Sequence, residues 1–399
     1  MNKLDYKKAN VLITGGAGFI GSSLAIELIA KGAKVTIVDA LIEGYGGNLF
    51  NIEPIKKKIK LIKGDVRDSD LIDKVVAGQD MIFNLAGTLS HVDSMSDPMT
   101  DLEINCKAQL SLLESVRKYN PKASVVFAGT RNQYGKAKYL PVDEKHPLEP
   151  TDINGINNIA AEQYHLMYTS VYGIPTISLR MTNTFGPRHQ MKHPRQGVLN
   201  WFIRQIMDGE KVKLYGSGRQ IRDVNFVDDV VEALLAVGMS KKGWGEAYNL
   251  GGIPVSLEDF VKEVIRIHFQ FSPVGTTFVR AFQTRRISDR RSVLMPLGAV
   301  KVAKKDIPPS KYIVSYASSV ATKSQKTHAL DDLNLSKLNI GRYYTKIPFP
   351  RDRKDIEIGD YIADYSKITK TFGWKPKVDL DEGIKRTIEY YIKHKRHYW

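Results

Sequence analysis

The glycine-rich stretch TGGAGFIG, residues 14–21, is the strongest single indication of how this chain folds. The apolar run ANVLIT (9–14) precedes it, and SSLAIELIAKG (22–32), whose apolar residues have helical spacing, follows it. Glycines between a strand and a helix permit a tight turn and let a pyrophosphate reach the free N–H groups at the helix N-terminus. The glycines with this spacing are Gly15, Gly16, Gly18 and Gly21. We therefore predict a strand–turn–helix unit that binds a dinucleotide, rather than a turn that only packs a strand on a helix.

Two acidic residues downstream extend this prediction. Asp39 ends the next apolar run, KVTIVDA (34–40), and a carboxylate there accepts hydrogen bonds from a ribose and repels a 2′-phosphate. Since no arginine follows in DALIEG, we expect NAD rather than NADP. Asp65, in GDVRD, ends a further apolar run, where sheets of this kind bind ligands. Asp65 is also a candidate cap for a helix starting near Ser69, and the two roles are compatible.

The rest of the chain alternates in the same way. Continuous Val, Ile and Leu runs indicate strands that are buried on both faces, and helical patterns separate them. The further strands are expected at 59–65, 80–87, 123–130 and 175–181. The further helices are expected at 69–77, 100–119 and 157–172. The pattern predicts an α/β fold, a Rossmann-type doubly wound parallel sheet.

Composition excludes several other classes. The 399 residues are 42% hydrophobic and 26% charged, as in ordinary globular proteins. No apolar run approaches the roughly 20 residues of a membrane span, and the polar N-terminus has no apolar signal core, so we expect neither a membrane segment nor a secretion signal. The single cysteine, Cys106, excludes an internal disulfide and a cysteine-built metal site. A reducing cytoplasm is the expected location.

The net charge of +16 is unevenly distributed. From residue 272 to residue 346 there are 14 Lys and Arg against 4 Asp and Glu, without a sustained hydrophobic period. We interpret residues 273–346 as a basic insertion that is loop-like or disordered. A partner-binding or nucleic-acid arm is the alternative, but charged runs are usually solvated surface, so nucleic acid is not an expected partner.

Eight features in order now resemble one family, the extended short-chain dehydrogenase/reductases, and within it the nucleotide-sugar epimerases and dehydratases of the UDP-glucose 4-epimerase type. They are TGGAGFIG, Asp39, GDVRD, NLAG, SHVDS, GTRNQYG, RMTNTFGPR and RQIRDVNFVDDVV. The resemblance covers about residues 8–270 and 347–392. It implies an NAD-binding Rossmann domain over 1–182, completed by about 224–250. It also implies a smaller, discontinuous substrate-binding domain over 183–223, 251–272 and 347–399, and a homodimer.

The resemblance also implies two sets of binding residues and no metal. NAD would contact Gly15, Gly18, Phe19, Ile20, Gly21, Asp39, Asp65, Val66, Leu85 and Ala86. A nucleotide sugar would contact His91, Asn183, Lys213, Tyr215, Arg222, and Arg351 or Arg353. Arginine suits these contacts because its planar fork matches phosphate oxygens. For Arg222 the alternative is a surface ion pair with Asp223 or Asp228.

The catalytic pair of the family is missing. The family uses Tyr-x-x-x-Lys on a helix, where the lysine lowers the pKa of the tyrosine that takes the hydroxyl proton. Thr130 resembles the accompanying Ser or Thr, but Asn154 and Asn158 stand at the tyrosine and lysine positions. An amide does not act as a base near neutral pH. The site where chemistry is expected therefore consists of Thr130, Asn154 and Asn158.

Other groups could take the proton. Tyr134 and Lys138 repeat the Tyr-x-x-x-Lys spacing only four residues after Thr130, and a second repeat lies in the C-terminal tail. His91 and Asp93 lie in SHVDS, where loop capping and hydrogen bonding are alternative roles.

Arg131 and Asn132 occupy the places of the Asp-Glu pair with which 4,6-dehydratases eliminate water. The resemblance thus implies a C4 epimerase of a UDP-linked or similar sugar, acting by transient hydride transfer to NAD in surface-polysaccharide synthesis. A pseudoenzyme that binds NAD and a nucleotide sugar, or a dehydratase or reductase, is the alternative.

Overall fold

A computed structural model describes residues 6–271, 340–350, 354 and 356–399. By its internal contacts the chain divides into two compact units, residues 1–267 with 343–399, and residues 268–342. Most of the second unit, and with it most of the predicted insertion 273–346, lies outside the described residues. The last residues of that predicted insertion, from Tyr344 to Lys346, are not loop: they belong to strand β12 (Tyr344–Ile347). The remaining description concerns the first unit.

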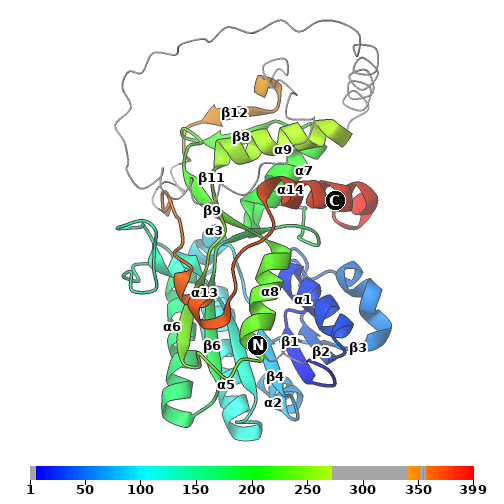
Figure 1. Ribbon diagram of the computed structural model, residues 1–399, viewed down its shortest axis with the longest axis vertical. Coiled ribbons are helices and arrows are strands. Elements are labelled where there is room, and N and C mark those ends of the chain that lie inside the picture. Colours follow the sequence, from blue (N-terminus) through cyan, green and yellow to red (C-terminus); the bar gives the residue numbers. More distant parts are fainter. Residues whose placement is uncertain (1–5, 272–339, 351–353, 355) are drawn as a thin grey trace, which may run out of the picture. The chain divides into compact units, whose positions relative to one another are not determined.

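Seven strands form the predicted parallel sheet (Figure 1). Their order is β10-β6-β5-β4-β1-β2-β3, and every neighbouring pair is parallel. The strands are β1 (Asn10–Thr14), β2 (Lys34–Asp39), β3 (Ile59–Lys63), β4 (Met81–Asn84), β5 (Ser124–Thr130), β6 (Thr176–Met181) and β10 (Glu246–Leu250). The order reverses between β1 and β4, where β1 pairs with both β2 and β4. In open sheets a crevice forms at such a point, outside the carboxyl ends of the strands.

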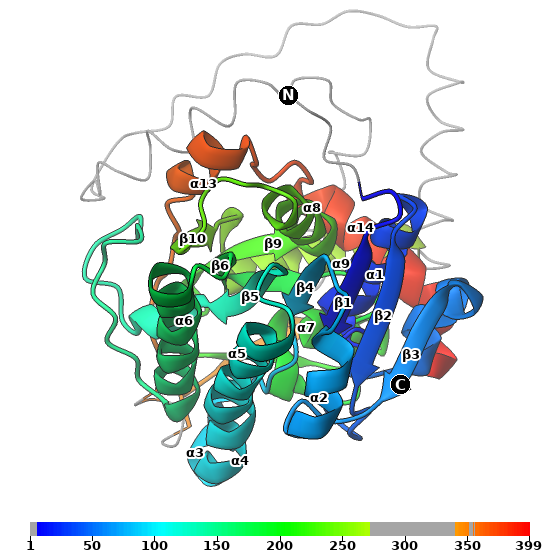
Figure 2. The same ribbon diagram turned by 90° about the horizontal axis from the view of Figure 1, so that it is seen from below.

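Helices cover both faces of the sheet (Figure 2). One layer packs α2 against α5 and α5 against α6, and the other packs α1 against α8. The helices are α1 (Phe19–Ala30), α2 (Ser69–Val76), α5 (Ala108–Tyr119), α6 (Ile153–Tyr172) and α8 (Val227–Gly238). Between α2, α5 and the sheet lies a core of aliphatic side chains that includes Leu12, Val38, Ile72, Ile82, Leu112 and Val125. Burial on both faces explains the continuous apolar runs of these strands.

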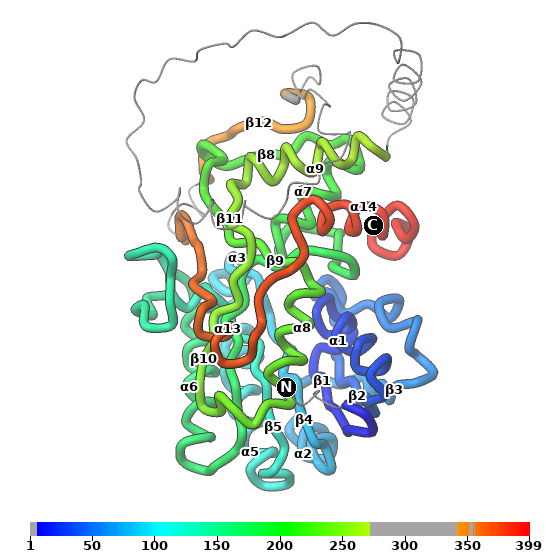
Figure 3. Tube along the Cα trace, in the orientation of Figure 1, coloured from blue at the N-terminus to red at the C-terminus, as the bar shows by residue number. Residues whose placement is uncertain are grey.

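Smaller elements come before and after β10, the last strand of the sheet in the chain, as the tube in Figure 3 traces. A three-stranded sheet has the order β11-β9-β7, and β12 pairs with β8. These strands are β7 (Asn183–Phe185), β8 (Val212–Tyr215), β9 (Ile221–Phe226) and β11 (Ile253–Ser256). The helices are α7 (Val198–Met207), α9 (Leu257–Phe271), α13 (Ser366–Phe372) and α14 (Leu380–His394). Within the described part of the chain, no helix combines the length and apolarity that crossing a bilayer requires.

Two helix predictions needed adjustment. The helix expected at 100–119 is interrupted: α3 (His91–Ser96) and α4 (Pro98–Leu102) lead through a π-helical turn (Glu103–Lys107) into α5. Helix α6 begins at Ile153, four residues before the predicted start, because the Asp152 carboxylate accepts a hydrogen bond from Gly155 N at 2.7 Å and caps it. This earlier start brings Asn154 into the first turn of the helix.

Candidate functional site

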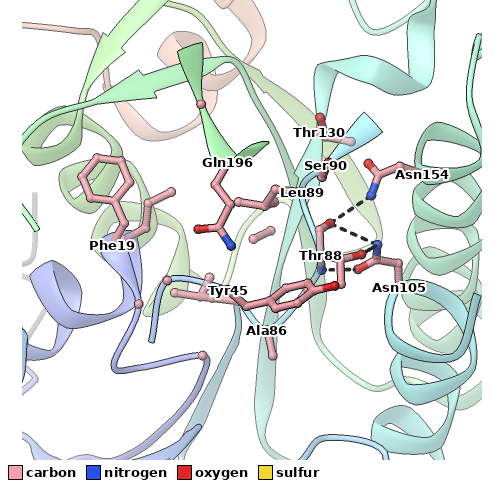
Figure 4. A pocket seen from close by; sticks show the side chains of 18 of the residues that line it. Phe19, Tyr45, Ala86, Thr88, Leu89, Ser90, Asn105, Thr130, Asn154 and Gln196 are labelled. Carbon is pink, nitrogen blue, oxygen red and sulfur yellow. Dashed lines mark hydrogen bonds between the residues drawn. The ribbon is translucent and has the colours of Figure 1, made fainter. Parts of the chain in front are cut away.

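A cavity of about 630 Å³ lies at the carboxyl ends of the central strands. Its walls come from the glycine turn, the segments after β2, β3, β4 and β5, the start of α6, and residues 181–184 and 189–199. Figure 4 shows part of this lining, with Phe19 on one side and Thr130 and Asn154 on the other. All ten residues predicted to contact NAD line this one cavity. Among the predicted substrate and catalytic residues, His91, Thr130, Asn154, Asn158, Asn183 and Arg222 also line it.

The N-terminus of α1 fits a pyrophosphate. Its N-cap residue is Gly18, which offers no capping side chain, and no acidic side chain lies in the first turn. The N–H groups of that turn are therefore free for an anion. The turn is also closed tightly, since a Cβ on Gly21 would lie 2.3 Å from the Gly15 carbonyl oxygen. Glycine at positions 15, 18 and 21 keeps side chains out of the close approach between the turn and a phosphate.

Asp39 is buried and its carboxylate is held in place by the backbone. Its Oδ2 accepts from Ala17 N and its Oδ1 from Leu41 N, both at 2.9 Å. Burial raises the pKa of Asp39, and the two backbone hydrogen bonds oppose that shift. Each oxygen keeps a lone pair, so the group fits the recognition of ribose hydroxyls.

The sequence also suggested Asp65 as a cap for the helix near Ser69, and this alternative is wrong. The cap of α2 is Asp68, whose carboxylate accepts from Leu71 N. Asp65 instead accepts from the guanidinium of Arg67 through Nε at 3.0 Å and Nη2 at 2.7 Å, and these hydrogen bonds lower its pKa.

One buried hydroxyl fixes the segment after β4. Thr14 Oγ1 accepts from Leu85 N at 3.0 Å and Ala86 N at 3.1 Å and donates to Asn84 Oδ1 at 3.0 Å. The predicted nicotinamide-side residues, Leu85 and Ala86, are thereby anchored to the strand that carries the glycine turn.

The structure does not bring Tyr134 to the cavity. It is fully buried, its hydroxyl donates to Asn249 Oδ1 at 2.7 Å and accepts from Arg180 Nη1 at 2.6 Å, and it is not part of the cavity lining. Burial raises its pKa to about 12. The Tyr-x-x-x-Lys spacing with Lys138 is coincidental: Lys138 pairs with Glu149.

Asn154 and Asn158 belong to a buried network of amides. Asn154 Nδ2 donates to Thr88 O at 2.9 Å (Figure 4). It also donates to Asp101 Oδ2 at 3.0 Å, and Asn158 Nδ2 donates to Asn154 O at 2.9 Å. Asp101 also accepts from Thr88, Asn105 and Asn157. The amides are thus satisfied by their own neighbours, and they supply neither a base nor a cation to the cavity.

A histidine–aspartate pair lies beside Thr130 instead. His91 Nδ1 lies 2.5 Å from Asp152 Oδ2, and Asn132 Nδ2 donates to His91 Nε2 at 2.8 Å. Asn132 N in turn donates to Thr130 Oγ1 at 3.2 Å. Burial acts to raise the pKa of Asp152, but the hydrogen bond and charge of His91, the Gly155 N–H and the charge of Arg131 together lower it. Because the Asn132 amide donates to Nε2, the proton of a neutral ring lies on Nδ1, toward Asp152, and Nε2 is the basic nitrogen.

Arg222 has neither of the partners suggested for it. It is buried, its Nη2 lies 2.5 Å from Glu357 Oε1, and its Nη1 donates to Gly359 O at 2.6 Å. Asn183 also faces the cavity, and its Nδ2 is buried with no hydrogen-bond partner among the described residues. An unpaired buried donor in a cavity is typical of a group that binds a ligand.

Of the remaining predicted residues, the two that the structure describes do not line the cavity. Lys213 and Tyr215 lie on β8 outside its lining, and the ring of Tyr215 lies 5.7 Å from that of Phe349. Arg351 and Arg353 lie outside the described residues. The substrate roles of these four residues stay predictions.

A model of the NAD-dependent epimerase/dehydratase family matches residues 11–251, more than half of the chain. The chain belongs to this family. NAD is therefore its cofactor, and the cavity with the glycine turn fits it.

Named relatives in this family act on different nucleotide sugars. A putative UDP-glucose 4-epimerase of Methanocaldococcus jannaschii is 35% identical over 243 residues, 60% of this chain and 76% of that protein. A dTDP-glucose 4,6-dehydratase of Streptomyces niveus is 31% identical over 251 residues, 61% and 72% of the two chains. The crystal structure of UDP-glucose 4-epimerase with UDP-glucose from Thermotoga maritima is 26% identical, has a TM-score of 0.71 and covers 97% of this chain and 99% of that one. Epimerases and dehydratases thus share this fold.

Proposed function

We propose that this member of the family is a nucleotide-sugar epimerase that inverts C4 of a UDP-linked or similar sugar. The chemistry that bound NAD supplies is reversible hydride exchange with a sugar carbon. The observation that carries the proposal is that one cavity is lined by the dinucleotide turn, by Thr130 and by the unpaired amide of Asn183. A cytoplasmic role in surface-polysaccharide synthesis belongs to the same proposal.

We propose His91 as the group that moves the hydroxyl proton. The carboxylates and the second histidine of the lining are committed elsewhere. Asp39 accepts from backbone N–H groups, Asp65 from Arg67, Asp93 from Arg195, and His189 contacts two carbonyl oxygens. His91 has a basic Nε2 facing Asn132, and Asp152 stabilises the imidazolium that forms when a proton arrives. A sugar hydroxyl that displaces the Asn132 amide would meet this nitrogen.

Dehydration by the family route is less well supported. It needs a carboxylic acid and a carboxylate after Thr130, whereas Arg131 and Asn132 stand there. Neither a guanidinium nor an amide exchanges protons near neutral pH.

The test is turnover of a panel of UDP-, dTDP- and GDP-sugars by the NAD-loaded protein, followed by separation of the epimers. We expect conversion without net NADH. His91→Gln should lower the rate by roughly 10²–10⁴ and leave NAD binding unchanged, because only proton transfer is lost. Absence of any conversion despite tight nucleotide-sugar binding would contradict the epimerase proposal. A full rate in His91→Gln would exclude His91 as the proton-transfer group.

The mutual hydrogen bonds of Asn154 and Asn158 favour a second candidate, a protein that binds NAD and a nucleotide sugar without turning it over. The double change Asn154→Tyr with Asn158→Lys separates the two. If the wild type is inactive and the double variant is active, the protein is a decayed enzyme. A loss from an already active protein indicates that the site works in its present form, because a tyrosine would break the hydrogen bonds of Asn154 to Thr88 and Asp101.

A further inference from the structure

Arg131 is a buried cation without a counter-ion. Its side chain is 8% exposed, it lines the cavity, and its Nη1 is buried with no hydrogen-bond partner in the described part of the chain. The other buried arginines differ: Arg180 pairs with Glu162 at 2.6 Å, and Arg222 pairs with Glu357 at 2.5 Å. A buried guanidinium is costly unless it is paired. The fold therefore holds a charge at this point that a ligand can satisfy.

Among the described residues, no carboxylate near Arg131 forms an ion pair with it. Asp152, whose charge acts on Arg131, is committed to His91 and to Gly155 N. Glu357 is committed to Arg222. Asp223 accepts from Gly252 N at 2.5 Å and Ala363 N at 2.8 Å, and burial raises its pKa to about 7. Burial and repulsion by Arg222 lower the pKa of Arg131 to about 10, so the group stays charged at neutral pH.

The position of Arg131 indicates which part of a ligand it meets. It begins the short 3-10 helix Arg131–Tyr134 directly after Thr130, and its guanidinium lies 5.0 Å from the ring centre of Tyr361. The stacking holds the guanidinium in place, and Arg131 lines the same cavity as Thr130, the residue before it in the chain, where the proposed reaction occurs. This neighbourhood favours the reacting sugar over the nucleotide as the part of the ligand that meets Arg131.

We propose that the sugar bears a carboxylate, and that Arg131 binds it as a specificity-determining residue. The substrate class is then a nucleotide-linked uronic acid or a similar acidic sugar. This inference rests on the proposed function, since it assumes that a nucleotide sugar occupies the cavity. A planar guanidinium with a free edge fits a carboxylate in a paired geometry, which a neutral hydroxymethyl group does not reproduce.

The test measures affinity by calorimetry in the NAD-loaded protein for three probes: UDP, UDP-glucose and UDP-glucuronic acid. The two sugars differ only in the oxidation of C6, so they isolate the carboxylate. We expect the acidic sugar to bind at least roughly 10-fold more tightly than the neutral one, as for a hydrogen-bonded charge pair. Arg131→Met should abolish that preference and change UDP affinity less than about two-fold.

Two further variants control for folding and for the phosphates. Arg131→Lys keeps the charge but not the fork and should keep part of the preference, while thermal unfolding and NAD affinity report whether each variant is folded. Arg222→Met should weaken the three probes alike and keep the preference for the acidic sugar, because its role is at the diphosphate.

The outcomes distinguish this inference from the proposed function. Equal affinity for the two sugars in the wild type, or an equal loss of UDP and UDP-glucuronic acid in Arg131→Met, overturns the carboxylate subsite. Turnover of a neutral sugar with no acidic preference leaves the epimerase proposal intact. Failure of all three probes to bind while NAD binds overturns both.

Discussion

At the scale of single residues, neutral amides replace the titratable tyrosine and lysine of the family, and a histidine–aspartate pair supplies the titratable groups near Thr130. The tyrosine and lysine positions hold amides that bind each other and Asp101. The titratable pair is His91 and Asp152, and Asn132 links it to Thr130. A neutral imidazole is a better base near pH 7 than any amide. We therefore expect His91 to transfer the proton that the tyrosine of the family transfers.

The Asp152–His91 pair should make stability depend on pH. The folded-state pKa of Asp152 is lowered from its ordinary value of 3.8, so this carboxylate contributes stability above that value and loses it as the pH falls through the folded-state pKa. Asp152→Asn keeps a capping oxygen for Gly155 N but loses the charge. Urea unfolding should show the variant less stable by about 1 kcal/mol at pH 7. The difference should shrink at pH 3; a difference that grows on acidification would contradict the assignment.

At the scale of elements, the turn between β1 and α1 depends on two glycines in different ways. A Cβ on Gly21 would lie 2.8 Å from Gly16 Cα as well as 2.3 Å from Gly15 O, both backbone atoms. A Cβ on Gly18 would have one close contact, Gly15 O at 3.2 Å, and would point into the region expected for the pyrophosphate. Gly21 is thus needed for the backbone of the turn to pack closely, and Gly18 for the pyrophosphate to approach the turn.

Alanine at these two positions should therefore have different effects on stability and on NAD binding. Gly21→Ala forces the turn apart and should lower the free energy of unfolding by about 1–3 kcal/mol, as overpacking does, with loss of NAD binding. Gly18→Ala should keep most of that stability and still weaken NAD binding. Thermal unfolding with and without NAD measures both effects. Equal destabilisation by the two variants would show that the turn is not organised in this way.

At the scale of the whole molecule, α6 presents an apolar face that the described structure leaves exposed. Ile156, Met167 and Val171 fall on one side of this helix by their spacing, and Val171 is 61% exposed. Apolar patches of this kind mark association sites. They support the expected homodimer.

Substitution on that face should change the mass of the particle. Val171→Glu introduces a charge that association would have to bury, so light scattering should fall from two chains of 44.9 kDa to one. Ile392→Glu, at a 51% exposed apolar position on α14, is the matched control and should leave the mass unchanged. A wild type that is monomeric at micromolar concentration would remove the basis for this prediction.

Most of the sheet could be predicted from the sequence because its signals are local. Buried parallel strands are continuous apolar runs, and the turn needs glycine at fixed spacing whatever lies around it. The interrupted helix at 100–119 and the early start of α6 were not predicted, because the first departs from regular hydrogen bonding within one apolar pattern and the second depends on the capping of Asp152.

The sequence by itself determined the α/β fold, the family and the NAD cavity, since these depend on residue types at short spacing. Only the tertiary structure decided which side chains are available for chemistry. It buried Tyr134 against Arg180, joined His91 to Asp152 across 61 positions and Arg222 to Glu357 across 135, and left Arg131 Nη1 buried without a hydrogen-bond partner among the described residues. Pairing and burial of charge depend on neighbours that are distant in the chain, and spacing alone carries no information about them.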